Sequence, residues 1–447
     1  MDFLIHYQAL KYLIGAFLLL VIVIPFALKE IRIHRNAKLL ANRIVPVSSL
    51  TEAQISLIKS RHPSGRKMYP MINKSVCVGC GTCVLSCRKA ETLTLIGGKS
   101  TLVNPLGCDG CGECENACPT GANQLTEFGI KIKVRLPDID ENYESNIKGI
   151  YIIGTLAGAG LIKETINQGR AVLNHIMRGV FPENLPQVLI VGAGPAGLSA
   201  FLSCKKFGLP ATCLEKEETA NTIKNFPKKK IVMAEPVDMP LFGPLWIGDT
   251  DREKLLEVWD RILEKTGAKI TLRAKLETIE RKGNQFVVSA SGRTYLCDKI
   301  VLALGVRGEP RKLKVPGENA SKVFYALLDA QEFAKSAVTI VGGGDAAIEA
   351  ALALMNQGCR VTLIVRDDGF PRAKARNQGK IAGAIKNGSV DVRFKSTVLE
   401  IKARLLIIST SDKTQEIEND FVFVMIGGEL PYPLLEKIGI RIIEKSL

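Results

Sequence analysis

The length, composition and charge of the chain narrow its class. It has 447 residues, of which 46% are hydrophobic and 23% charged, and its formal net charge is +15. This length exceeds what one compact core accommodates, so two or three domains are expected, and the apolar content excludes a largely disordered chain. No basic stripe is interleaved with aromatic residues, which make up only 6%. The positive charge therefore favours an anionic membrane or an acidic partner, and no nucleic acid.

The N-terminal residues predict a membrane anchor. Residues 12–28, YLIGAFLLLVIVIPFAL, carry no charge and lie between Lys11 and Lys29. As a helix they would extend about 25 Å, the short end of what spans a bilayer. A signal peptide is the alternative, but the basic residues follow the apolar run and no small-residue cleavage site is present. We expect one uncleaved helix in the cytoplasmic membrane, with the N-terminus outside and the soluble domains in the cytoplasm.

Eight of the twelve cysteines form two copies of one motif. Residues 77–87 read CVGCGTCVLSC and residues 108–118 read CDGCGECENAC, so the second copy lies 31 residues after the first. Disulfides are disfavoured in the reducing cytoplasm, and zinc sites usually pair two short CxxC clips. C-x2-C-x2-C-x3-C, twice, is the spacing of bacterial ferredoxins with two [4Fe–4S] clusters, each taking its fourth thiolate from the other motif. The expected ligands are Cys77, Cys80, Cys83 and Cys118 for one cluster and Cys108, Cys111, Cys114 and Cys87 for the other.

A glycine motif after the cysteines predicts a dinucleotide site. Residues 188–200, VLIVGAGPAGLSA, read as an apolar strand, a glycine-rich turn and a helix. Such glycines allow a tight turn and the close approach of a pyrophosphate to the helix N-terminus, and a carboxylate after the next strand can accept a hydrogen bond from a ribose hydroxyl. The candidate binding residues are Gly192, Gly194, Pro195, Ala196, Gly197 and Glu215.

A second copy of the motif predicts a second nucleotide. It occupies residues 338–351, VTIVGGGDAAIEAA, and its next strand reads RVTLIV. Val365 stands where the first copy has its carboxylate, so the nearby cations favour a 2′-phosphate and NADPH, whereas Asp367 favours NADH. Both nucleotides stay open. The candidate residues are Gly342, Gly344, Asp345, Ala347 and Arg366.

From residue 186 onward the sequence resembles the thioredoxin-reductase-like group of FAD/NAD(P)-dependent oxidoreductases. The resemblance implies FAD at the first glycine motif, NAD(P) at the second, and an α/β fold with two Rossmann-like domains, beside a small α+β ferredoxin domain and one transmembrane helix. In this group the flavin domain ends with a strand, a Gly-Asp pair and a helix that covers the flavin. That pattern is not found after residues 421–442 but in residues 142–176, with Gly154 and Thr155 at the place of the pair.

The flavin domain is therefore expected to be circularly permuted, which joins the ferredoxin motifs in the chain to the flavin-covering helix. We expect residues 421–442 to pack beside residues 142–155. The expected divisions are 1–35 for the anchor, 36–70 for a linker, 71–132 for the ferredoxin domain, 133–185 for the permuted segment, 186–321 for the FAD domain, 322–420 for the NAD(P) domain and 421–447 for a return segment of the FAD domain.

The group also implies a chemistry that this chain lacks. Thioredoxin reductases carry a CxxC disulfide just before the second glycine motif, whereas residues 322–333 contain no cysteine. The remaining thiols are expected to be ordinary buried side chains. They are Cys204, Cys213, Cys297 and Cys359.

These features predict an FAD-dependent NAD(P)H oxidoreductase of the ferredoxin–NAD(P) reductase type. A flavin converts between the two electrons of a hydride and the single electrons of iron–sulfur clusters, so no side chain need act as acid, base or nucleophile. The expected partner is a membrane-bound quinone or cytochrome complex, with either direction of electron flow and with an oligomer allowed. The alternatives are a subunit that feeds a separate soluble reductase, or an integral subunit of a respiratory complex that is inactive alone.

Overall fold

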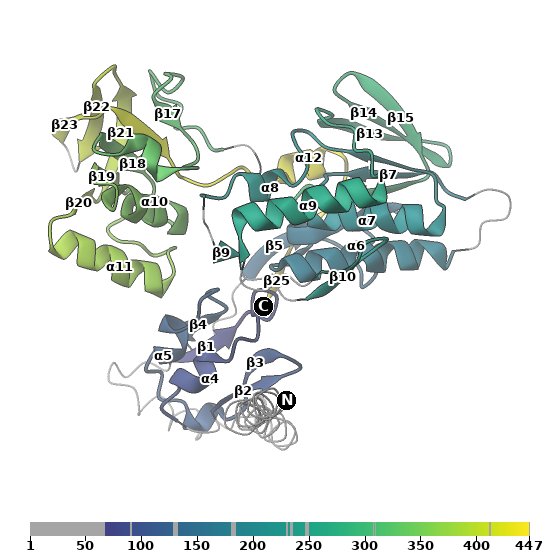
Figure 1. Ribbon diagram of the computed structural model, residues 1–447, viewed down its shortest axis with the longest axis horizontal. Helices are drawn as coiled ribbons and strands as arrows, with labels where there is room; N and C mark the ends of the chain where they lie inside the picture. The colour runs from purple at the N-terminus through teal and green to yellow at the C-terminus, as the bar shows by residue number, and fades with distance from the viewer. Residues whose placement is uncertain are drawn as a thin grey trace, which may run out of the picture. The chain divides into compact units, whose positions relative to one another are not determined.

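Figure 1 shows the computed structural model of the chain. The anchor predicted at 12–28 lies outside the described residues, and so does the predicted linker as far as residue 67. Within the described ranges no helix is both long and apolar enough to span a membrane. The chain divides into two compact units, Met1–Ile130 and Lys131–Leu447. The described residues are 68–89, 92–127, 133–179, 185–228, 231–232, 236–245, 250–306, 308, 310–410 and 413–446.

The first unit is built from two similar halves. In each half a loop with two cysteines enters a short helix that carries a third, through a glycine with positive φ, 76° at Gly81 and 83° at Gly112. A side chain with a Cβ is strained in that conformation, so glycine sets where both helices begin. Strand β1 pairs antiparallel with β4, and β2 with β3. The elements are β1 (Met68–Ile72), α4 (Thr82–Ser86), β2 (Leu93–Ile96), β3 (Lys99–Leu102), η3 (Pro105–Gly107), α5 (Glu113–Asn116) and β4 (Asn123–Glu127).

The second unit begins its first dinucleotide domain with a strand from the permuted segment. Four parallel strands form a sheet in the order β6-β16-β7-β8, in which Ile150, Tyr151 and Ile152 pair with Ile300, Val301 and Leu302. All three residues of β6 are buried. The segment predicted to complete the flavin domain therefore lies in its sheet. The strands are β6 (Ile150–Ile152), β7 (Val188–Val191), β8 (Ala211–Leu214) and β16 (Lys299–Leu302).

Helices α6 (Ile162–Met177) and α7 (Pro195–Phe207) lie side by side on this sheet (Figure 1). Their backbones approach closely at Gly169, where an added Cβ would lie 2.5 Å from the carbonyl oxygen of Ala196. The hydroxyl of Ser199 donates to the carbonyl of Ile166 at 2.7 Å. Glycine at this crossing thus lets the helix of the permuted segment pack directly on the helix of the first glycine motif.

The remaining elements of this domain surround the sheet. Strands β13, β14 and β15 form an antiparallel meander in which Phe286, Val288 and Ala290 are buried at every second position, as expected for a sheet with one face on the core. Helix α9 packs Trp259 into the core beside α6 and α7. The elements are η4 (Gly154–Ala157), α8 (Asn221–Lys224), β9 (Ile231–Val232), β10 (Val237–Met239), β11 (Gly243–Leu245), β12 (Thr250–Asp251), α9 (Arg252–Thr266), β13 (Leu276–Lys282), β14 (Gln285–Ala290) and β15 (Arg293–Cys297).

The second dinucleotide domain has a five-stranded parallel sheet in the order β17-β24-β18-β19-β20. Strand β24 pairs with β17 and β18, and its residues Val422, Phe423 and Val424 are buried. The prediction that the return segment of the FAD domain begins at residue 421 is therefore wrong, because this first strand belongs to the sheet of the second dinucleotide domain. The elements are β17 (Val323–Phe324), η5 (Ala330–Phe333), β18 (Ala337–Val341), α10 (Asp345–Met355), β19 (Arg360–Ile364), α11 (Ala375–Lys386), β20 (Val390–Arg393), β21 (Ser396–Ile401), β22 (Leu405–Thr410), β23 (Lys413–Glu418) and β24 (Phe421–Val424).

After β24 the chain returns to the flavin domain. Strand β25 (Ile442–Ser446) pairs antiparallel with β5 (Lys133–Pro137). The side chain of Asn146 donates to the carbonyl of Gly439 and accepts from the backbone N–H of Arg441, both at 2.9 Å. Leu435 of α12 (Tyr432–Lys437) is buried in the core that contains β6. Residues after β24 therefore pack beside the permuted segment, as the sequence predicts.

The crossing of α6 and α7 can be tested at Gly169. We expect Gly169→Ala to destabilise the protein by about 1–3 kcal/mol, because the new methyl group meets backbone that cannot move away. Gly379→Ala is the matched control, since this exposed glycine in α11 has nothing within 4 Å of an added Cβ. The control should stabilise by about 0.5–1 kcal/mol. Chemical denaturation followed by circular dichroism measures both, and equal effects would contradict the close packing.

Candidate functional site

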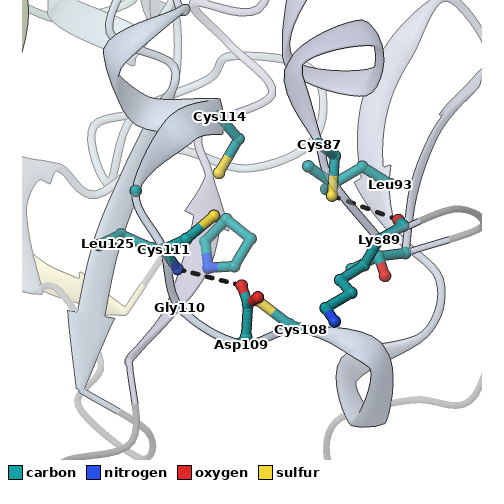
Figure 2. A pocket seen from close by; sticks show the side chains of 12 residues that line it. Cys87, Lys89, Leu93, Cys108, Asp109, Gly110, Cys111, Cys114 and Leu125 are labelled. Atoms are coloured by element: carbon teal, nitrogen blue, oxygen red, sulfur yellow. Dashed lines mark hydrogen bonds between the residues drawn. The ribbon is translucent and has the colours of Figure 1, made fainter. Parts of the chain in front are cut away.

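Four cysteines from two sequence motifs line one pocket of the first unit. Figure 2 shows Cys87 beside Cys108, Cys111 and Cys114. Cys87 belongs to the first motif and follows α4, whereas the other three belong to the loop and helix of the second motif. The fold therefore brings together the four thiols that the sequence predicts for one cluster, with the fourth supplied by the other half of the unit.

The other predicted set is also gathered. Cys77 and Cys118 pack together in a small buried group with Ala122. Ser100 contacts the sulfurs of both Cys77 and Cys83. Burial raises the pKa of Cys83 above its ordinary value, hydrogen bonds from Ser100 and Asn123 oppose this rise, and the charges of Cys118 and Cys80 add to it. In the described part of the chain no three His, Cys, Asp or Glu side chains are close enough to bind a single metal ion. A [4Fe–4S] cluster does not need such a close group, because each thiolate binds a different iron atom.

The thiols differ in how readily they ionise. Burial raises the pKa of Cys114 to about 12, and the nearby sulfur of Cys108 adds to this rise. Burial would also raise the pKa of Cys118, but hydrogen bonds from the backbone of Asn123, Thr120 and Ala122 and from the Thr120 hydroxyl outweigh it and lower the pKa. Because iron binds the thiolate form, loading of these sites with clusters must release protons.

The second unit contains a cavity of about 530 Å³ at the first glycine motif, within the range of roughly 300–1,000 Å³ typical of ligand sites. Its lining includes the permuted segment between Gly154 and Thr165, the glycine motif with Glu215 and Lys216, and the return segment from Glu429 to Leu434. Residues from 221–226, 274–276 and 303–308 contribute further lining. The permuted segment and the return segment thus meet the glycine motif at one cavity.

The glycines of this motif suit a bound pyrophosphate. An added Cβ at Gly192 would lie 2.4 Å from the carbonyl oxygen of Ala303, and one at Gly197 would lie 1.8 Å from the carbonyl oxygen of Gly192. Both glycines are therefore needed for close packing. At Gly194, by contrast, an added Cβ meets nothing within 4 Å and would project into open space. Gly194 and Pro195 line the cavity at the start of α7, which has no side-chain cap. Free N–H groups at such a helix end favour a phosphate.

The polar side chains predicted for FAD also line the cavity. The carboxylate of Glu215 is buried and accepts from the backbone N–H groups of Ala193 and Glu217, at 2.7 and 3.1 Å, which fixes its orientation at the end of β8. Thr155 accepts from the backbone N–H of Val306 at 3.1 Å and keeps its hydroxyl proton available to donate. The residues present thus fit FAD, with the hydroxyl of Thr155 in place of the carboxylate of the related group.

The sequence did not single out the lining from the return segment. Leu430, Pro431, Pro433 and Leu434 border the cavity, yet no short motif marks them. Only the expectation that the return segment belongs to the flavin domain pointed to this region, because apolar wall residues follow no spacing rule.

At the second glycine motif the predicted residues have more varied roles. An added Cβ at Gly342 would lie 2.3 Å from the carbonyl of Met425, and at Gly344 it meets nothing within 4 Å, as in the first motif. Ala347 is fully buried and provides the close packing of helix on strand. The carboxylate of Asp345 accepts from the backbone N–H of Lys374 at 2.9 Å and from the side chain of Asn377 at 2.7 Å, so this residue orders the loop before α11.

The arginines near this motif are held by one carboxylate. Arg366 and Arg372 lie 3.7 and 3.6 Å from the two carboxylate oxygens of Asp367, and both arginine side chains are largely exposed. Asp367 thus stands between the two cations that would meet a 2′-phosphate.

The hydroxyl of Thr155 can be tested as a flavin ligand. We expect Thr155→Val to weaken FAD binding about tenfold, which corresponds to about 1.4 kcal/mol for one lost hydrogen bond. Thr155→Ser keeps the hydroxyl and should bind as the unaltered chain does. Fluorescence titration of the apoprotein with FAD measures both, and equal affinity of Thr155→Val and the unaltered chain would exclude a direct contact.

The lone thiols give a prediction with a defined pH dependence. Burial raises the pKa of Cys204 and of Cys297 to about 12. A raised pKa means less thiolate at any given pH, so at pH 8 the native thiolate fraction is about a thousandfold below that of an ordinary thiol. We expect neither residue to be alkylated by iodoacetamide in the native protein, and both to react after denaturation. Peptide mass spectrometry reads this out, and rapid native labelling at pH 8 would contradict the burial.

Comparison with known proteins agrees with this geometry. Residues 189–446 match the family described as pyridine nucleotide-disulphide oxidoreductase, and residues 69–119 match a 4Fe-4S dicluster domain. Bacilliredoxin reductase Bdr of Bacillus subtilis is 27% identical over 262 residues, which cover 57% of this chain and 81% of that protein. A ferredoxin–NADP reductase of Thermus thermophilus is 31% identical over 267 residues, covering 54% of this chain and 72% of the relative.

A solved structure shows the same likeness. Bacillithiol disulfide reductase Bdr from Bacillus cereus is 26% identical, with a TM-score of 0.51 over 58% of this chain and 82% of that one. The family match begins at β7 and ends in β25, so it leaves out the permuted segment that the sheet pairing assigns to the same domain. Since the match covers more than half of the sequence, the chain belongs to the pyridine nucleotide-disulphide oxidoreductase family, as an FAD-dependent oxidoreductase that also carries a 4Fe-4S dicluster domain.

Proposed function

We propose that the chain transfers electrons between NAD(P)H, FAD and two [4Fe–4S] clusters, and from these to or from a membrane-bound quinone or cytochrome partner. The observation that carries the proposal is the pocket in which Cys87 joins Cys108, Cys111 and Cys114. A lone metal-binding loop would use ligands of one motif, whereas here each half of the unit supplies a thiol to the other. This exchange is the pattern of two-cluster ferredoxins.

The place of a redox disulfide is taken by packed aromatic rings. In residues 322–333, Phe324 and Phe333 lie with ring centroids 5.2 Å apart, and Phe333 lies 5.0 Å from both Phe421 and Phe423. These rings form part of the core of the second dinucleotide domain. Dithiol chemistry at this position therefore has no side chain to perform it, which supports the clusters as the onward path for electrons.

Each group of residues has a binding role in this proposal. The uncapped start of α7, Glu215 and Thr155 would hold FAD, and the start of α10 with Gly342 and Gly344 would hold the nicotinamide nucleotide. FAD, when bound, accepts the hydride of the nicotinamide and releases its two electrons one at a time. The protein contributes position, burial and hydrogen bonds, and no side chain has to gain or lose a proton.

The membrane partner rests on the sequence. Residues 12–28 carry no charge, they precede a series of basic residues, and the whole chain has a net charge of +15. An apolar helix of this length, with positive charge on one side, would hold the protein at the cytoplasmic face of a membrane. A partner within that membrane would then be in reach of the clusters.

Loss of an exposed ligand from each cluster tests the route. We expect Cys80→Ser combined with Cys111→Ser to leave flavin reduction by NAD(P)H intact, because the nucleotide and flavin sites lie outside the cysteine motifs. Onward transfer to a soluble quinone analogue should fall to background, because its path runs through the clusters. Single-turnover stopped flow follows the flavin absorbance, and steady-state assays follow the quinone.

The matched control is Cys359→Ser, a buried thiol outside the motifs that donates to the carbonyl of Phe333 at 2.9 Å, as a serine hydroxyl also can. This variant should behave as the unaltered chain in both assays. Quinone reduction by the double variant at the unaltered rate would show that electrons bypass the clusters, and the proposed route would be wrong.

A further inference from the structure

The two cysteine motifs hold their clusters in unlike surroundings. Because the second copy lies 31 residues after the first, each position of one motif has a counterpart in the other. Three counterparts differ in charge, and in each pair the first motif is neutral and the second acidic. The pairs are Val78 and Asp109, Thr82 and Glu113, and Val84 and Glu115.

One buried residue serves two ligands of the first set. The backbone N–H of Ser100, which is fully buried in β3, donates to the sulfur of Cys77 at 3.3 Å. The Ser100 hydroxyl lies 3.2 Å from the sulfur of Cys83. When iron is bound both sulfurs are thiolates without a proton, so the proton between hydroxyl and sulfur must come from Ser100. Ser100 then donates two hydrogen bonds to the first cluster.

Other donors face the same set. The backbone N–H of Ala122 donates to Cys118 at 3.2 Å, and the hydroxyl of Thr82 lies 3.0 Å from the sulfur of Cys80. The ammonium group of Lys99 is held at the carbonyl of Cys77 at 2.6 Å, which places a positive charge beside this ligand. Each sulfur of the first set therefore has a hydrogen-bond donor beside it, and the ammonium group of Lys99 lies at the backbone of Cys77.

The second set has two backbone donors, Gly110 to Cys108 and Glu113 to Cys111, but it also faces a carboxylate. Asp109 lies between two ligands in the sequence, and its oxygen accepts from the backbone N–H of Cys111 at 3.3 Å, as Figure 2 shows. The carboxylate is thus fixed at the lining of the pocket and occupies an N–H group that is then unavailable to a sulfur. The sulfur of Cys87 faces a carbonyl oxygen, that of Lys89, at 3.3 Å.

The remaining charges near the second set largely cancel. Arg88 pairs with Glu113 at 2.6 Å, and Lys89 lines the pocket opposite Asp109. The buried hydroxyl of Thr92 also lines the pocket and has no hydrogen-bond partner among the described residues, so one side-chain donor is available here. Asp109 is therefore the carboxylate that lines the pocket of the second set, and Lys89 is the cation that lines it.

We propose that Ser100 and Asp109 set the two clusters at different reduction potentials, with the cluster held by Cys77, Cys80, Cys83 and Cys118 the more easily reduced. Each cluster takes up one electron, which adds one negative charge. Donors to the sulfurs and a nearby cation stabilise that charge, whereas a fixed carboxylate opposes it. The first electron to enter the unit therefore resides at the first cluster. This inference rests on the proposed two-cluster route.

The test is a redox titration of the full-length protein followed by EPR and visible spectra. The unaltered chain should show two separate one-electron waves. We expect Ser100→Ala to lower the equilibrium constant for reduction of the first cluster about tenfold, which lowers the potential of the upper wave by about 59 mV for one electron. The potential of the lower wave should not change. Thr101→Ala is the matched control, because the neighbouring hydroxyl on β3 donates to the carbonyl of Lys99 and to no sulfur.

The opposite change tests the other cluster. Asp109→Asn removes the charge and should raise the equilibrium constant for reduction of the second cluster about tenfold. The potential of the lower wave should therefore rise by about 59 mV. Asp109→Glu retains the charge and should leave the lower wave near its original position. If Ser100→Ala does not load with clusters, the Asp109 pair decides the question alone.

Iron analysis separates the two proposals. About eight iron atoms per chain with a single combined wave, or a shift of the wrong wave in either variant, would overturn the inference and leave the two-cluster route standing. About four iron atoms per chain would overturn both. Two waves that respond separately to Ser100 and Asp109, in the stated directions, support the assignment of the upper wave to the first cluster.

Discussion

The parallel pairing of β6 with β16 is the interaction on which the second unit depends. It joins residues 150–152 to residues 300–302, and every side chain of β6 is buried. A buried strand must satisfy its backbone hydrogen bonds within the sheet. The permuted segment is therefore held at the edge of the sheet, where it supplies the fourth strand. The turn after β6 then brings Gly154 and Thr155 to the cavity, and α6 follows onto α7.

Close backbone approach is the second constraint. Gly192, Gly197 and Gly169 each lie where an added Cβ would meet backbone atoms at less than 3 Å, so the glycine-rich turn, the sheet and the two helices pack without side chains between them. Gly194 lies in the same motif but faces open space. The motif thus combines packing glycines with one that leaves room for a ligand, and only the surrounding residues distinguish the two roles.

Two near-identical cysteine motifs do not create equivalent sites. The cysteine spacing repeats, yet the residues between and around the thiols differ: Ser100 and Lys99 of the β2–β3 hairpin contact Cys77 of the first set, while Asp109 contacts Cys111 of the second. Charge and hydrogen bonding at the sulfurs govern the energy of an added electron. The proposed difference in reduction potential between the two clusters therefore depends on a few side chains outside the repeated cysteine pattern.

The sequence by itself predicted the two sets of cysteines that the fold brings together, both glycine motifs and the lack of a CxxC pair, because each depends on residue type and spacing, and the resemblance to a known family predicted the permuted order. The end of the second sheet was misjudged: Phe421–Val424 form an apolar strand that suits either domain, and only its pairing with β18 assigns it. The cavity wall at Pro431 and Leu434 and the contact of Ser100 with two sulfurs were likewise decided by tertiary structure. Such contacts join residues distant in the chain, and no local pattern specifies which distant backbone a buried side chain will meet.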